Sequence, residues 1–180
     1  DRSSGDFGIL FGTMDGKMVA SRDLFFDTDQ SFREVELGKE NFEFEIKFTL
    51  PATNGGTLVK SYTFHNDTYG ADVRYEFHNL GSVIANYEYQ ITWDRGVPYA
   101  ERNSVDESGF AAGYAYAGKE LTEIDASKVG EPVSKTIGGQ VDWVATRNKY
   151  FGIALIPVSP ATEGAIIEGH RFGAPDQGAL

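Results

Sequence analysis

One segment in the first half of the chain constrains the fold more than any other feature. Residues 41–50 read NFEFEIKFTL, in which apolar side chains at even positions alternate with polar or charged side chains at every odd position. A period of two residues places these two sets on opposite faces of a β-strand. The segment therefore predicts a strand with one face in the core and the other in water.

The same alternation recurs along the chain, separated by turn residues. An Asn-Gly-Gly turn at 54–56 joins the first strand to residues 58–64, which predicts a β-hairpin. Further strands are expected at 72–80 and 86–93, and a second hairpin is expected around Met14, Asp15 and Gly16. Residues 94–113 resemble a long loop, and no segment shows the period of a helix longer than two turns. The pattern predicts an all-β fold, an antiparallel β-sandwich.

A stretch near the C-terminal end, residues 141–158, reads VDWVATRNKYFGIALIPV. Its longest run of apolar residues is too short for a membrane helix, which needs about 20 such residues. It predicts a hairpin with Trp143 and Ala145 on one face and a polar turn at 147–149. Residues 150–156 are apolar on both faces, which is typical of a central strand. Weaker signals indicate short strands around Leu121 and Val133.

Length and charge limit the class of protein. A chain of 180 residues has room for one well-cored domain, so residues 1–180 are expected to form a single domain with a frayed tail at 172–180. The formal net charge of -11 disfavours nucleic acid and anionic lipid surfaces as partners. The chain has no cysteine, which excludes disulfides and thiolate chemistry.

The residues give little sign of catalysis. Asp27 and Asp29 have the spacing that opens a calcium loop, but Phe32 occupies the glycine position and a solvated turn is favoured. The three histidines are too scattered for a metal site, and no nucleophile or phosphate-loop motif occurs. We therefore expect no enzyme activity, no metal and no cofactor.

Several aromatic residues are candidates for lining a groove. They belong to the segments ITWD, VPYAERN and GYAYAGK, and such rings can stack on a sugar or a peptide or can instead pin loops onto the core. The candidates are Trp93, Tyr99, Tyr114 and Tyr116.

Four segments of the chain resemble those of a known family. Tyr62-Thr-Phe64, the strand from Tyr69 to Phe77, the Trp93-Asp-Arg-Gly segment and the final hairpin together resemble the periplasmic domain of YidC-type membrane protein insertases. The likeness covers about Phe42 to Pro157 and is most specific in the hairpin. The hairpin residues of this motif, to which we assign a structural role, include Trp143, Asn148, Tyr150, Phe151 and Pro157.

The resemblance implies a twisted super-sandwich, the fold shared with galactose mutarotases. It also implies a fragment of a larger protein of the bacterial inner membrane, with this domain in the periplasm and membrane contact only through helices that this chain lacks. The implied function is a docking or substrate-contact surface in the insertion and folding of membrane proteins. The implied partners are the Sec translocon, its accessory subunits and nascent inner-membrane proteins. Because function does not follow from fold, a carbohydrate-binding or mutarotase-like domain is the alternative.

Overall fold

The computed structural model describes residues 6–28, 30–31, 34–100 and 104–172. Residues 173–180 of the predicted frayed tail lie outside this range, as does Asp29. The chain forms two compact units, a first unit over Asp6–Trp93 and a second unit from Asp94 onward. That residues 1–180 fold as one domain stays a prediction.

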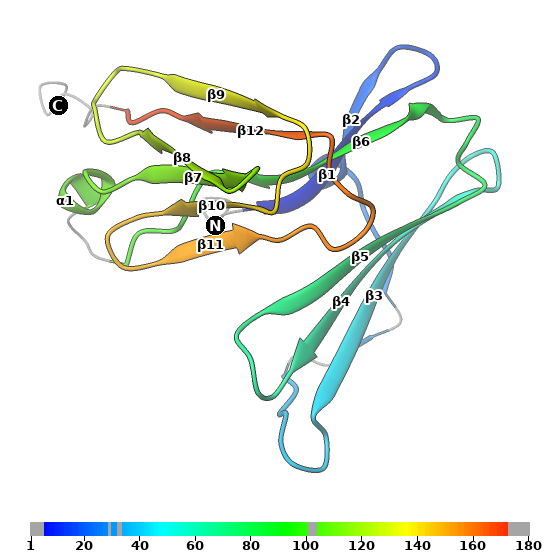
Figure 1. Ribbon diagram of the computed structural model, residues 1–180. Helices are drawn as coiled ribbons and strands as arrows, with labels where there is room; N and C mark the ends of the chain where they lie inside the picture. Colours follow the sequence, from blue (N-terminus) through cyan, green and yellow to red (C-terminus); the bar gives the residue numbers. More distant parts are fainter. Residues whose placement is uncertain (1–5, 29, 32–33, 101–103, 173–180) are drawn as a thin grey trace, which may run out of the picture. The chain divides into compact units, whose positions relative to one another are not determined.

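The first unit contains two three-stranded sheets, with strand orders β2-β1-β6 and β3-β4-β5 (Figure 1). The strand pairs β1-β2, β3-β4 and β4-β5 are antiparallel, as the hairpin turns between them require. A short 3-10 helix, η1, follows β2 at Ser21–Asp23. The strands are β1 (Asp6–Thr13), β2 (Met18–Ala20), β3 (Glu43–Pro51), β4 (Thr57–His65), β5 (Ala71–His78) and β6 (Ile84–Asp94).

One hydrophobic core joins the two sheets of the first unit. Ile9 and Phe11 of β1 pack with Leu58 of β4, and Leu80 and Ile84 complete the buried cluster. Leu58 is 2% exposed and Ile9 is 1% exposed, so both side chains are fully removed from water. Two sheets over a shared core are the β-sandwich arrangement that the alternating pattern predicted.

The apolar face of the β3-β4-β5 sheet is covered over only part of its length. Leu50 and Phe77 pack against the core, and Phe7 of β1 reaches the ring of Tyr62 at a centroid distance of 6.3 Å. Toward the far end Phe64 is 40% exposed and Phe42 is 64% exposed. The prediction that this whole face lies in the core is therefore wrong for its outer part, where Phe64 and Phe42 remain exposed to water.

The second unit contains a four-stranded sheet of order β11-β10-β7-β8 and a separate β9-β12 pair. Its strand pairs are also antiparallel. No helix among the described ranges is long and apolar enough to cross a membrane, and the helix here has a single turn. The elements are α1 (Ser104–Ser108), β7 (Ala112–Ala117), β8 (Glu120–Asp125), β9 (Val133–Gly138), β10 (Trp143–Arg147), β11 (Gly152–Leu155) and β12 (Gly164–Gly169).

Small residues let the two layers of the second unit approach closely. Ala112 and Ala115 of β7 are buried, and a Cβ added to Gly113 would collide with the side chain of Ile167 on β12. Figure 1 shows the β9-β12 pair beside the four-stranded sheet. The core of this unit is therefore thin, and Gly113 is required where β12 lies over β7.

Three sequence expectations need correction in the second unit. Residues 150–156 do not form a central strand: β11 pairs only with β10 among the described strands and lies at the sheet edge, with Phe151 58% exposed. The loop expected at 94–113 contains α1 and the first residues of β7. Tyr114 and Tyr116 lie on β7 and not in a loop. Alanine and glycine fill the buried face of β7, so the hydrophobic alternation that marks a strand is weak there.

Replacing a core side chain of the first unit tests this packing. Leu58→Ala should lower the free energy of unfolding by about 2–5 kcal/mol, because it leaves a cavity between the two sheets. Leu121→Ala is the control, since Leu121 is 58% exposed and its loss should change stability by less than about 0.5 kcal/mol. Urea unfolding followed by circular dichroism measures both. Equal losses in the two variants would contradict the described core.

Candidate docking surface

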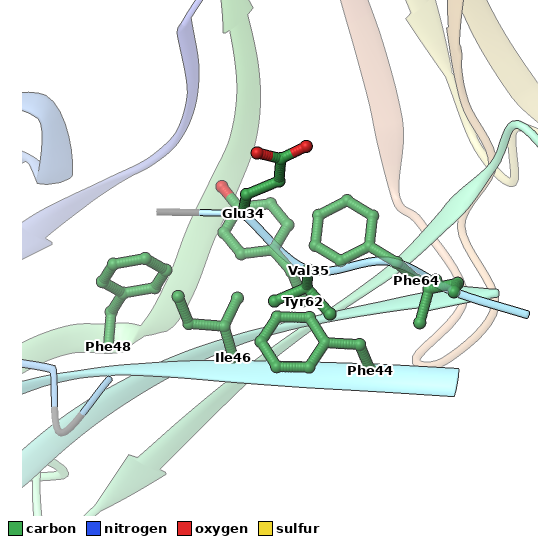
Figure 2. A pocket seen from close by; sticks show the side chains of 8 residues that line it. Glu34, Val35, Phe44, Ile46, Phe48, Tyr62 and Phe64 are labelled. Carbon is green, nitrogen blue, oxygen red and sulfur yellow. The ribbon is translucent and has the colours of Figure 1, made fainter. Parts of the chain in front are cut away.

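A hollow of about 550 Å³ lies on the apolar face of the β3-β4 hairpin, in the first unit. Figure 2 shows the side chains that line it, with the carboxylate of Glu34 turned away from the rings. The lining is almost entirely apolar, and its charged group stands at the rim. The lining residues are Glu34, Val35, Leu37, Phe44, Ile46, Phe48, Tyr62 and Phe64.

The strand register places these apolar side chains side by side. Phe44 lies opposite Phe64 and Ile46 lies opposite Tyr62 across the β3-β4 ladder. The rings of Tyr62 and Phe64 stack at a centroid distance of 6.2 Å, and Phe48 meets Tyr62 edge-on at 6.1 Å. Because alternate residues of paired strands share a face, the pattern of residues 42–50 is itself the cause of the aromatic floor.

Segment Glu34–Leu37 forms the other wall of the hollow. Asn66 holds the residue that follows this segment, because its side-chain amide donates to the carbonyl oxygen of Gly38 at 3.0 Å. Val35 remains 38% exposed and Leu37 is half-buried, so the wall does not seal the floor from water. An apolar surface of this kind, open on a folded domain, is typical of a contact site.

A smaller hollow of about 170 Å³ adjoins the first and shares Phe48 and Tyr62 with it. Here Lys60 lies half-buried, and its Nζ donates to the carbonyl oxygen of Phe7 at 2.8 Å. The same Nζ lies 4.9 Å from the centroid of the Tyr62 ring and 5.4 Å from that of Phe7. The aromatic rings and the carbonyl together stabilise a cation on an otherwise apolar face.

The family-motif residues lie in the second unit, and three of them, Asn148, Tyr150 and Phe151, form the turn between β10 and β11. Asn148 is 4% exposed, and its side-chain oxygen accepts hydrogen bonds from the backbone N–H groups of Tyr150 and Phe151 at 3.0 and 2.8 Å. Its amide nitrogen donates to the carbonyl oxygen of Pro98 at 3.0 Å and to Glu107 Oε1 at 2.6 Å. One buried amide thus fixes the turn, the preceding connection and helix α1.

Glu107 is the partner that the sequence pattern did not reveal. Its side chain is 0% exposed and also accepts from the backbone N–H of Ala100, at 2.9 Å to Oε2 and 3.1 Å to Oε1. Beside it, Lys149 Nζ lies 2.7 Å from Asp106 Oδ2. Nothing in the local sequence distinguishes Glu107 from the many exposed carboxylates, because its burial results from long-range contacts.

The other motif and groove residues are placed as follows. Trp143 lies opposite Tyr116 in the β10-β7 ladder and stacks on its ring at 5.8 Å, whereas Pro157 is exposed after β11. Neither hollow described here is lined by any of the four predicted groove aromatics. Trp93 belongs to β6 of the first unit and Tyr99 to the connection before α1. A groove role for these four stays a prediction.

Tyr114 belongs to a polar chain on the surface of the second unit. Its hydroxyl donates to Glu123 Oε1 at 3.0 Å and accepts from Arg147 Nε at 2.9 Å. The hydrogen bond to Tyr114 raises the pKa of the Arg147 guanidinium above its ordinary value. Among the residues that the structure describes, no group of three His, Cys, Asp or Glu side chains is arranged to hold a metal ion.

The fold and the hollow define a class: an all-β domain with an open apolar hollow on one sheet. The chain belongs to the YidC periplasmic domain family, whose model matches residues 3–170. It is 36% identical to the membrane protein insertase YidC of Chlorobaculum parvum over 98% of this chain and 30% of that protein. It is 34% identical to that of Chlorobium phaeovibrioides and 35% identical to that of Chlorobaculum tepidum, over 95% and 96% of this chain.

These matches confirm the family and the periplasmic location, on the outer side of a bacterial inner membrane, that the sequence predicted. The chain spans about 30% of the length of these relatives, 29% for the last two. No solved structure matches the chain.

Substitutions at Asn148 test the buried polar contact. Asn148→Asp should cost more than Asn148→Ala, at least about 3 kcal/mol of unfolding free energy, because it sets a second carboxylate against Glu107 in a buried site. Adding Glu107→Gln to Asn148→Asp should recover part of this loss, since the glutamine amide can donate to the new aspartate. Chemical unfolding of the parent chain and the three variants measures the coupling. A double variant no more stable than Asn148→Asp would contradict the direct contact.

Proposed function

We propose that this domain is the periplasmic contact surface of a membrane protein insertase that assists the insertion and folding of inner-membrane proteins. The single observation that carries the proposal is the apolar hollow on β3 and β4, which stays open although its side chains are those of a core. Its location on the periplasmic side and the names of the relatives support the same role. In this proposal residues 1–180 act as one domain of a longer protein.

The hollow suits segments that are apolar and not yet folded. A membrane protein in transit exposes apolar side chains and periplasmic loops that have no final partner, and transient cover for them lowers the cost of exposure to water. Half-buried aromatic rings on the floor of the hollow, such as Phe48 and Tyr62, can cover varied apolar side chains without a specific fit. The partners that we propose are nascent inner-membrane proteins, and the Sec translocon with its accessory subunits. No covalent chemistry is needed.

The alternative, a mutarotase-like or carbohydrate-binding domain, finds less support. A mutarotase requires an acid and a base that converge on one cleft. Of the three histidines, His65 lies between two carboxylates, 3.1 Å from Asp72 Oδ2 and 3.6 Å from Glu43 Oε2, but no histidine lines either hollow. An anomerisation assay with common aldoses should show no turnover above the uncatalysed rate, and measurable turnover would favour the alternative.

Site-specific photocrosslinking tests the contact surface. A photoreactive side chain at Ile46, in the intact insertase that carries this domain, should crosslink to an arrested nascent membrane protein or to Sec components. Lys47 is the matched control, because it is the next residue on β3 and points to the opposite face of the sheet. We expect crosslinks at least about fivefold stronger from Ile46, because adjacent residues of a strand point to opposite faces of the sheet. Equal labelling from the two positions would contradict the proposal.

A further inference from the structure

Among the residues that the structure describes, the outer edge of β3 is paired only at one end, where Thr49 meets Asp27. Thr49 exchanges both backbone hydrogen bonds with Asp27, at 2.8 and 2.9 Å. Its N–H and C=O therefore point away from β4, in the plane of the sheet. In an antiparallel strand the residues two positions apart point their backbone groups the same way. Lys47, Glu45 and Glu43 therefore present N–H and C=O groups along this edge, and no described strand pairs with them.

This edge borders the apolar hollow. The residues between the outward-pointing ones, Phe44 and Ile46, bond inward to β4 and place their side chains in the hollow. A strand added beside β3 would point every second side chain toward the same face as Phe44 and Ile46. The edge would supply backbone hydrogen bonds, and the hollow would accept alternate apolar side chains.

The charges around the edge select the partner. Residues 34–45 contain five glutamates and one lysine, and the sole lysine beyond them on β3, Lys47, is 3.1 Å from Glu45. Glu43 and Glu45 project from the polar face, with side chains 51% and 43% exposed. Two copies of this edge paired with Glu43 opposite Glu45 would bring glutamates against glutamates, which disfavours self-pairing in that register. A strand with cationic side chains on that face would instead neutralise them.

We propose that β3 accepts an extended polypeptide segment by strand addition over residues 43–47, and that the segment alternates apolar and basic side chains. Its apolar residues occupy the hollow beside Phe44 and Ile46, and its basic residues lie across from Glu43 and Glu45. Either strand direction preserves this alternation. The inference rests on the proposed contact function and names the site and the chemistry of the segment.

A peptide titration tests the pattern. The ligand is a fluorescein-labelled peptide of about seven residues that alternates arginine and valine, long enough to span residues 43–47. Fluorescence anisotropy with the 180-residue chain should give an affinity at least about tenfold higher than for a peptide of the same composition with its arginines and valines in two blocks, because only the alternating order satisfies both faces. A peptide that alternates glutamate and valine should not bind.

N-methylated peptides test the backbone pairing without changing the protein. Methylating every second amide of the alternating peptide produces two isomers, one of which loses the donors that face β3 while the other keeps them. The two isomers should differ in affinity by about tenfold or more. Equal affinities would overturn strand addition.

Two substitutions at one position make the same test on the protein. Glu45→Pro removes an N–H that points away from β4, so it leaves the internal ladder intact, as proline does on edge strands. Glu45→Ala is the matched control, because it removes the same charge and keeps the N–H. We expect Glu45→Pro to bind the alternating peptide at least about fivefold more weakly than Glu45→Ala, with thermal melts showing that both remain folded.

The outcomes separate this inference from the proposed function. Equal binding of alternating and block peptides would overturn strand addition even where Ile46 crosslinks to nascent chains in the intact insertase. Peptide binding that persists while those crosslinks are absent would overturn the proposed function and leave the edge site standing. Self-association of the chain that Glu45→Pro abolishes would assign the edge to a second copy and overturn the inference.

Discussion

The length of one apolar face is the constraint on which the first unit depends. The β3-β4-β5 sheet carries apolar side chains on one side from Leu50 to Phe44, and the buried core cluster lies at the end near Leu58. The covered end supplies the core that holds the unit together, since the burial of such side chains is the main favourable term in folding. The outer end of the face carries apolar side chains of the same kind, but the buried core cluster does not extend over them. The hollow is thus a continuation of the core that no described strand closes.

The alternation of residues 42–50 predicted the strand correctly but could not predict where its cover ends. Periodicity reports which side chains share a face, and it contains no information about the length of the opposing layer. The hairpins around Gly16 and Gly55 followed from their turn residues, and both are present. β7 was missed for the opposite reason: Gly113 and Ala115 form its buried face, so close packing there replaced hydrophobic bulk.

The candidate sites show the same division between local and long-range information. Asn148 stood out through a family motif, and the structure shows what holds it in place, because its side chain bonds to Glu107, Pro98, Tyr150 and Phe151. Glu107 could not be recognised, because 41 positions separate it from Asn148 in the sequence. The most recognisable segment of the chain therefore lies at a buried structural contact in the second unit, whereas the open apolar surface belongs to the first. The motif that identifies the family therefore does not coincide with the open apolar hollow.

The acidity of the chain acquires a physical role at the edge of β3. An exposed strand edge beside an apolar floor is a template for aggregation, and charged side chains are the usual protection. Lysines would give that protection as well as glutamates, so the sign of the charge needs a separate reason. In our proposal Glu43 and Glu45 attract a cationic segment, whereas lysines would select an acidic one. Segments that flank membrane helices are rich in lysine and arginine on the side that stays in the cytoplasm. Short basic segments are therefore less common on the periplasmic side, and the acidic edge beside the apolar hollow is suited to hold one that is exposed there.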